Sequence, residues 1–252
     1  MANRKVATES ALYLFGVSRG SDKHPGKLAS PGVDGVHPVE AVPCGEFLCW
    51  VSPVDAVAFS RELESNMENL EWLAAHGVRH QQVVGEIADK ETIVPARFGT
   101  LFSSQAALLK DVESRKSALT KVFDRIADSD EWGVKVFAEE QPSPATADTP
   151  VSSGREYLEQ KAARVKKRPE RADRDVQEFA EALDKVSTES APAGKVSGTQ
   201  PGLLWQATFL VPRSKRNQWD RVLQDFLNQW EGRRRIEVTG PWPPYSFVSD
   251  AK

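Results

Sequence analysis

Short apolar runs separated by turn-forming residues occupy the first part of the chain. Residues 11–17 are Ala-Leu-Tyr-Leu-Phe-Gly-Val, a nearly continuous apolar run that favours a central strand buried on both faces. Strand patterns recur at residues 39–42 and 46–52. Residues 18–38 are rich in glycine, proline and serine, which predicts a long loop. The chain is therefore expected to begin with the strands of one sheet.

A helical period follows between Glu68 and Lys90. Apolar or small residues recur there at steps of three and four, and together they form a stripe that is predicted to pack on the sheet: Leu70, Leu73, Ala74, Gly77, His80, Val84 and Ile87. A glycine inside a helix costs roughly 1 kcal/mol relative to alanine. Gly77 is therefore expected to mark a close approach to another element.

The segment from Thr92 to Phe102 combines a strand signal with two residues that interrupt strands. Pro95 has no N–H to donate to a neighbouring strand, and Gly99 weakens a strand interior. The strand is therefore predicted to be broken or bulged, with Arg97 projecting from the bend. We expect the Arg97 guanidinium to satisfy carbonyl groups that lose their partners at the bend.

A second helix and one more strand complete the predicted first domain. Ser103 or Ser104 is expected to cap the helix, whose apolar face comprises Leu108, Val112, Leu119, Val122 and Ile126. Residues 132–138 alternate as a strand does. The order of these elements predicts an α+β fold whose first domain, residues 1–140, is a ferredoxin-like sheet with helices on one face.

Residues 141–151 contain three prolines and no periodic apolar position, which predicts a linker. Residues 152–252 are predicted to form a smaller α+β domain led by a long charged helix. The heptad seam of that helix comprises Leu158, Ala162, Val165, Pro169, Ala172, Val176, Phe179, Leu183 and Val186. A kink is expected at Pro169.

The rest of the second domain is predicted from three patterns. Residues 203–211 favour a strand, and residues 233–239 alternate as a half-buried strand. Between them, Ser214 is expected to cap a helix whose apolar face comprises Trp219, Val222, Leu223, Phe226, Leu227 and Trp230.

Composition and charge narrow the class of protein. The 252 residues are 40% hydrophobic and 27% charged, with a formal net charge of −3, which argues against general affinity for nucleic acid. The odd separation of Cys44 and Cys49 along a predicted strand places them on opposite faces, so no disulfide is expected. No signal peptide and no apolar run long enough to span a membrane is found. These observations predict a cytosolic protein without a membrane partner.

Catalytic and metal-binding patterns are weak. His76 and His80 have the i, i+4 spacing of zinc ligands, but no third ligand lies nearby, so a surface histidine and a hydrogen-bonded core histidine are favoured. Neither cysteine has an activating base beside it, and no glycine-rich phosphate loop is present. The sequence therefore predicts no enzyme activity, no catalytic residue, no metal and no cofactor.

Three basic runs, Arg164–Arg168, Arg213–Arg216 and Arg233–Arg235, leave a second possibility open. Ferredoxin-like sheets can bind RNA through aromatic residues, although no strand here resembles such a motif. Solvated helix faces are the favoured interpretation. An RNA- or nucleotide-binding module is retained as the alternative, followed by a hydrolase with an unrecognised site.

Two strings resemble a known family. Val94–Phe102, V-P-A-R-F-G-T-L-F, resembles the V-P-x-R-F-G-T-x-F signature of the gas vesicle GvpF/GvpL family. Gly240–Phe247, G-P-W-P-P-Y-S-F, resembles the ending of the same family, and Gly154–Leu158 is similar to the start of its second-domain helix. Two rare strings in the same order are more specific than either alone.

The resemblance implies an accessory or minor structural protein of gas vesicles. Such a protein is expected in the cytoplasm and at the gas vesicle, where it binds the small hydrophobic shell protein and other accessory proteins and assists assembly. Neither nucleic acid nor a membrane is an expected partner. The residues expected to contact partners are Arg97, Phe98, Gly77, Trp242 and Tyr245.

Overall fold

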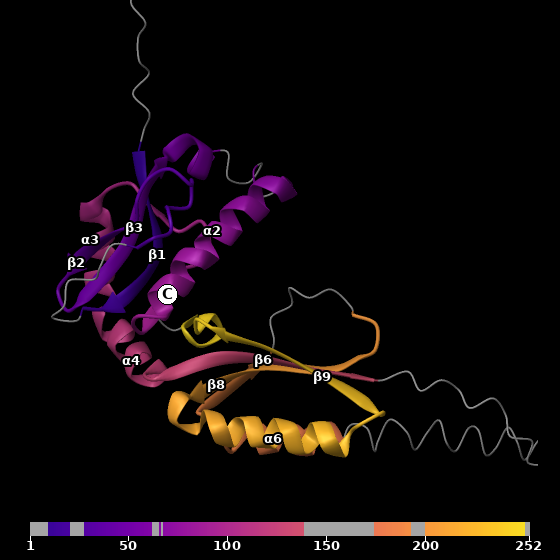
Figure 1. Cartoon of the computed structure of the whole chain (residues 1–252). Helices are drawn as coiled ribbons and strands as arrows, with labels where there is room; N and C mark the ends of the chain where they lie inside the picture. Colours follow the sequence, from indigo (N-terminus) through magenta and orange to yellow (C-terminus); the bar gives the residue numbers. More distant parts are fainter. Residues whose placement is uncertain are drawn as a thin grey trace, which may run out of the picture. The chain divides into compact units, whose positions relative to one another are not determined.

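The computed structural model describes residues 10–20, 28–61, 66, 68–138, 174–192 and 200–249. The chain divides into two compact units, the first containing residues 1–128 and 242–252 and the second residues 129–241 (Figure 1). The predicted linker at 141–151 and the predicted kink at Pro169 lie outside the described residues.

The first unit contains an antiparallel sheet built around its first strand. The strands are β1 Ser10–Arg19, β2 Glu40–Cys44, β3 Phe47–Asp55, β4 Ile93–Pro95 and β5 Leu101–Phe102. Their order is β2-β3-β1-β4, with β5 also paired to β1. The prediction of a central strand at residues 11–17 is confirmed, because β1 has neighbours on both sides.

Helices cover both faces of this sheet, so the predicted single helical layer is wrong (Figure 1). They are α2 Leu70–Ala88, α3 Gln105–Ser114 and α4 Lys116–Ile126, with a short π-helix at Val57–Arg61. The α2 side chain of His80 contacts the rings of Tyr13 and Phe15 in β1. On the other face, Phe47 of β3 stacks on Phe123 of α4 at 5.6 Å. Apolar side chains on both faces of β1 and β3 require two covering layers.

Only the C-terminal half of α2 is buried against the sheet. His80, Val83, Val84 and Ile87 are buried, whereas Leu70 is 79% exposed. A Cβ added at Gly77 would meet nothing within 4 Å. The prediction that the whole stripe is covered, and that Gly77 marks a close approach, is therefore wrong.

The two cysteines lie on one face and not on opposite faces as predicted. A tight hairpin joins β2 to β3, with Gly45 at φ +61°, and pairs Val42 with Cys49. Cys44 and Cys49 then lie on the same face of adjacent strands, and Cys44 Sγ donates to the Leu109 carbonyl at 3.7 Å. Burial raises the pKa of Cys49 to about 12, so the thiol is protonated at neutral pH. The prediction assumed that both cysteines lie on one strand, whereas the turn between them places them on two paired strands.

The helical region after β5 is largely as predicted. Ser104 is the N-cap of α3, and its hydroxyl accepts a hydrogen bond from Ala107 N–H at 3.2 Å. The chain breaks into two helices at Arg115, which is the C-cap of α3. All five residues of the predicted apolar face are buried.

The second unit contains the other sheet. Its first strand, β6, was predicted to belong to the first domain, and that prediction is wrong. The strands are β6 Ser129–Ala138, β7 Glu189–Pro192, β8 Leu203–Pro212 and β9 Arg234–Trp242, in the order β7-β8-β6-β9. The strand predicted at 132–138 pairs with β8 and does not close the first sheet. Strand periodicity identifies the element but carries no information about a partner about 75 residues away.

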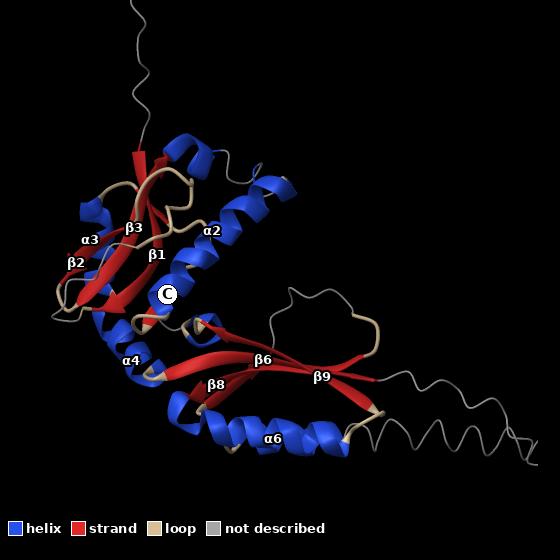
Figure 2. Cartoon of the chain, in the orientation of Figure 1, coloured by secondary structure: helices blue, strands red, loops and turns tan. Residues whose placement is uncertain are grey.

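Helices pack on one face of the second sheet. They are α6 Arg216–Gln229, shown beside the sheet in Figure 2, and helical residues 174–184. The end of the predicted heptad seam is buried in this core, where Phe179 contacts Trp230 at 5.1 Å. Ser214 lies in a 3-10 turn and makes no capping hydrogen bond, so the cap prediction is wrong.

A pair of glycine substitutions tests the packing of the first unit. A Cβ at Gly16 would lie 2.6 Å from Ile93 Cδ1 and 2.8 Å from the Val94 carbonyl oxygen, so Gly16→Ala should lower the free energy of unfolding by about 1–3 kcal/mol. Gly77→Ala should instead raise it by roughly 1 kcal/mol, because the position is open and helical. Urea unfolding monitored by tryptophan fluorescence measures both. Equal effects at the two positions would contradict this packing.

Candidate functional site

The candidate site is the bend between β4 and β5, residues 96–100. The break predicted from Pro95 and Gly99 is confirmed, since β4 ends at Pro95 and Gly99 has φ +82°. Ala96 N–H still donates to the Phe15 carbonyl, and Thr100 N–H closes the turn on the Arg97 carbonyl. The bend is thus held at both ends, and two consecutive residues, Arg97 and Phe98, lie at its centre.

Phe98 belongs to an aromatic cluster beneath the bend. Its ring centroid lies 6.2 Å from Tyr13, 5.9 Å from His80 and 6.1 Å from Trp72. All three neighbours come from β1 or α2. Phe98 therefore fixes the bend to the core between the sheet and α2, and only part of its ring is available to a partner.

A chain of hydrogen bonds runs through the same cluster. Gly99 N–H donates to the Tyr13 hydroxyl at 3.2 Å, that hydroxyl lies 2.9 Å from His80 Nδ1, and His80 Nε2 lies 3.0 Å from the Tyr245 hydroxyl. Four segments far apart in sequence are joined by these contacts. The prediction of a hydrogen-bonded core histidine at position 80 is confirmed.

Burial determines the protonation states of His80 and Tyr13 in this chain of hydrogen bonds. It lowers the pKa of His80 to about 4 and raises the pKa of Tyr13, so both groups are neutral at pH 7. Because Tyr13 accepts from Gly99, its own proton is directed to Nδ1. His80 then carries its proton on Nε2 and donates to Tyr245.

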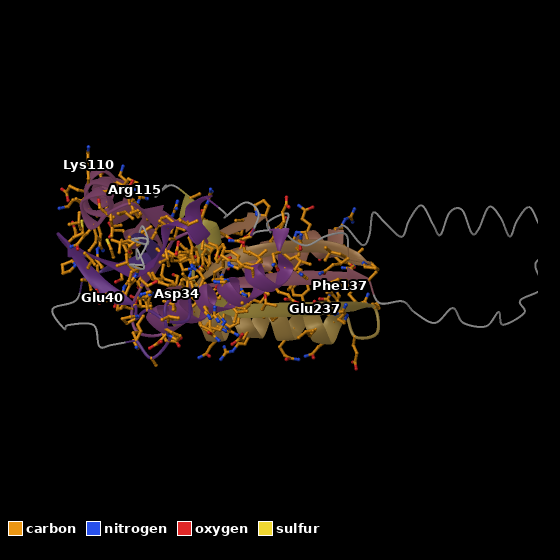
Figure 3. The ribbon with its side chains drawn as sticks, turned by 90° about the horizontal axis from the view of Figure 1, so that it is seen from above. Asp34, Glu40, Lys110, Arg115, Phe137 and Glu237 are labelled. Carbon is orange, nitrogen blue, oxygen red and sulfur yellow. The ribbon has the colours of Figure 1, made fainter. Side chains whose placement is uncertain are left out.

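Arg97 lies on the exposed side of the bend and lines a cavity of about 310 Å³. The cavity lies between the bend and helices α3 and α4, and its lining includes Pro95, Arg115 and Leu119. Figure 3 labels Arg115 near Lys110 on the α3 side of the first unit. Arg97 makes no side-chain hydrogen bond or ion pair within the part of the chain that the structure describes. The expectation that its guanidinium satisfies carbonyl groups of the bend is therefore wrong.

The C-terminal string, Gly240–Phe247, and the following residue Val248 contribute side chains on both sides of the bend. Tyr245 joins the hydrogen-bonded chain, Phe247 is buried, and Val248 lines the cavity that Arg97 also lines. Arg125 of α4 donates to the Phe247 carbonyl. Trp242 is 50% exposed, and none of the ring contacts among the described residues joins it to this cluster. Tyr245 and Phe247 of the second string thus lie at the same site as the first string.

Tyr13 and Arg115 were not singled out from the sequence. Tyr13 lies inside an apolar run, where a tyrosine is an ordinary core residue, and Arg115 is one of many charged helix residues. Of the predicted contact residues, the structure gathers Phe98 and Tyr245 around His80, places Arg97 at the cavity and leaves Gly77 on the uncovered half of α2.

The described residues hold no group of three or more His, Cys, Asp or Glu side chains arranged for a metal ion. None of the described helices is both long and apolar enough to cross a bilayer. His76 bonds the Trp72 carbonyl through Nδ1 at 2.7 Å. The site thus consists of an aromatic cluster on one side of the bend and a partly open cavity on the other.

The fold and site define a two-sheet α+β protein whose distinctive residues pack around the β4–β5 bend. A model of the family described as "Gas vesicle synthesis protein GvpL/GvpF" matches residues 11–249. The chain belongs to this family, which is not a family of enzymes. Membership implies a role in gas vesicle formation.

Relatives match over nearly the whole chain. Gas vesicle protein L of Streptomyces sp. (strain CB03234) is 26% identical over 98% of this chain and 96% of its own. Gas vesicle protein F of the same organism is 28% identical, covering 94% and 99%. The crystal structure of GvpF from Anabaena sp. PCC7120 has a TM-score of 0.67 at 19% identity, covering 95% of this chain and 96% of that one. The last similarity concerns the fold.

The buried histidine predicts a pH dependence of stability. His80 titrates near pH 6.5 when unfolded but near 4 when folded, so the unfolded state binds more protons between these values. The free energy of unfolding should therefore fall by up to about 3 kcal/mol, through this group alone, as pH drops from 6.5 to 4. The part of that fall due to His80 should vanish in His80→Gln.

His76→Gln is the matched control, because His76 lies one turn earlier on α2 and is only partly buried. Denaturant unfolding at several pH values measures the slopes of the three proteins. If His80→Gln is too unstable to measure, the NMR titration of the His80 ring in the wild-type chain gives the same answer. An imidazole that protonates near pH 6.5 in the folded protein would contradict the assignment.

Proposed function

We propose that the chain is an accessory or minor structural protein of gas vesicles, one that binds the shell protein and assists vesicle assembly. It acts in the cytoplasm and at the growing vesicle, with other accessory proteins as further partners. Family membership supports a role in gas vesicle assembly. The surface of the first unit supports binding of the shell protein as the way in which the protein assists assembly.

The observation that carries this proposal is the uncovered half of α2. Leu70 is 79% exposed and Val78 56% exposed, and Ala74 between them is also exposed, which gives an apolar stripe at i, i+4 and i+8. Most apolar residues of a helix of this kind face the core. A stripe that the fold leaves in water is suited to an apolar partner helix or strand.

Gly77 lies beside this stripe and is open to the surroundings. The absence of a side chain there lets the backbone of a partner approach α2 closely, next to Ala74 and Val78. The shell protein would expose apolar surface before it assembles, and covering that surface prevents premature association. Arg97, Phe98, Trp242 and Tyr245 remain proposed contacts, with the exposed Arg97 and Trp242 the more accessible of the four.

Two observations disfavour the alternative of an RNA- or nucleotide-binding module. Tyr13 and Phe15 on β1 are fully buried under α2, so neither can stack on a base. In the second unit, the basic runs contain Arg213 paired with Asp130, Arg216 with Asp220 and Arg234 with Asp175. Arginines paired in this way contribute little to binding phosphates. The run Arg164–Arg168 lies outside the described residues.

Capture of the purified shell protein by the full-length chain tests the proposal. Leu70→Asp with Val78→Asp puts two carboxylates on the stripe and should reduce capture at least tenfold, because burying each charge is costly. The melting temperature should change little, since both side chains are exposed. The full chain is required, because Tyr245, Phe247 and Val248 pack in the first unit and a fragment ending near residue 140 lacks them.

Val36→Asp is the matched control, since Val36 is also 79% exposed and lies in the first unit. Its capture should equal that of the wild-type chain. Unchanged capture by the stripe variant together with a loss in Trp242→Ala would move the docking surface to the C-terminal string and overturn this proposal for α2.

Heparin chromatography separates the two classes of function. The proposed assembly protein should elute at or below about 0.2 M salt, whereas an RNA-binding module should be retained with a steep dependence on salt. Retention that weakens linearly with the logarithm of salt concentration, and that is lost in Arg-to-Gln variants of the second unit, would favour the alternative.

A further inference from the structure

The cavity beside the β4–β5 bend is small and mostly apolar. It encloses about 310 Å³, near the lower end of the range for small-ligand sites. Its apolar wall comes from the sheet, from α4 and from the residue that follows the C-terminal string: Leu14, Val17, Val94, Phe102, Leu119 and Val248. A space of this size and lining accommodates one aliphatic side chain with its backbone.

Charged side chains line one part of the cavity. Arg115 forms an ion pair with Asp111 one helical turn away. Arg97 also lines the cavity, and its guanidinium has no partner among the described residues. With two cations and one anion, the lining carries one positive charge in excess. A ligand that brings a single negative charge complements it.

The bend contributes one backbone donor beside the Arg97 side chain. Among the residues of the bend that line the cavity, Ala96 and Thr100 donate their N–H groups to the carbonyls of Phe15 and Arg97. The N–H group of Arg97 has no such acceptor in the described part of the chain. A backbone N–H group beside a guanidinium is suited to holding a carboxylate.

We propose that this cavity captures the C-terminal residue of a partner polypeptide when that residue is aliphatic. In a terminal residue the carboxylate and the side chain share one Cα, so the side chain enters the apolar cavity while the carboxylate meets Arg97. An acidic residue within a chain cannot present both groups from one Cα. The proposal is independent of shell-protein docking on α2, which packs on the opposite face of the sheet.

Three short peptides test the proposal on the full-length protein by NMR titration. Gly-Ser-Gly-Ala-Leu with a free carboxylate should bind at least tenfold more tightly than the same peptide with an amidated end, because only the first supplies the charge. Gly-Ser-Gly-Asp-Leu with an amidated end supplies a carboxylate from a side chain and should also bind weakly. The shifted signals should be those of Arg97 and the methyl groups of Leu119 and Val248.

Arg97→Gln should reduce binding of the free-acid peptide about tenfold, and Arg97→Lys should retain part of it because the charge remains. Arg221→Gln, an exposed arginine of α6, is the control and should bind as the wild-type chain does. The Arg97 variants should melt like the parent, since the side chain makes no contact that holds the fold. Equal binding of the amidated peptides, unchanged binding in Arg97→Gln, or no binding at millimolar peptide would each overturn the proposal.

Discussion

The chain of hydrogen bonds from Gly99 through Tyr13 and His80 to Tyr245 holds the first unit together. It joins the β4–β5 bend, the central strand, α2 and the C-terminal string, with separations of 67 and 165 residues along the sequence for its two histidine contacts. A buried polar group left without its partner costs about 1–3 kcal/mol. Each member of the chain therefore depends on the presence of the others.

This interaction explains why the bend presents two different surfaces. Gly99 adopts a positive φ and donates inward, which brings Phe98 into the aromatic cluster and leaves Arg97 at the cavity on the other side. Residues 245–248 cover the same region, because Tyr245 contacts His80 and Val248 lines the cavity. Residues of both distinctive strings, Phe98 and Gly99 of the first and Tyr245 of the second, thus meet around His80 and Tyr13.

Local chemistry made part of this structure predictable. Pro95 and Gly99 identify the broken strand, Ser104 identifies the helix start, and the apolar run at 11–17 identifies the central strand. These features depend on residues within a few positions of one another. The helical period of α2 also predicts the helix itself.

The remainder depends on contacts between distant segments, which periodicity does not contain. A stripe of apolar residues does not reveal where the sheet ends beneath it, so Leu70 was wrongly expected to be covered. Likewise, the alternation of β6 gives no indication that its partner is β8, and the hairpin at Gly45 reverses the geometry inferred for the cysteines. The expectation that Arg97 bonds carbonyl groups of the bend was wrong because the sequence of a bend does not show which carbonyl groups lack a partner.

Hydrogen–deuterium exchange of the full-length chain, with and without the purified shell protein, tests the central claim most directly. If the uncovered half of α2 is the docking surface, the backbone amides of residues 70–78 should exchange more slowly in the complex, because the bound shell protein restricts local opening of this part of the helix. Amide exchange in the second unit, including α6, should be the same with and without the shell protein. Protection confined to the second unit, with residues 70–78 exchanging as in the free protein, would contradict the account.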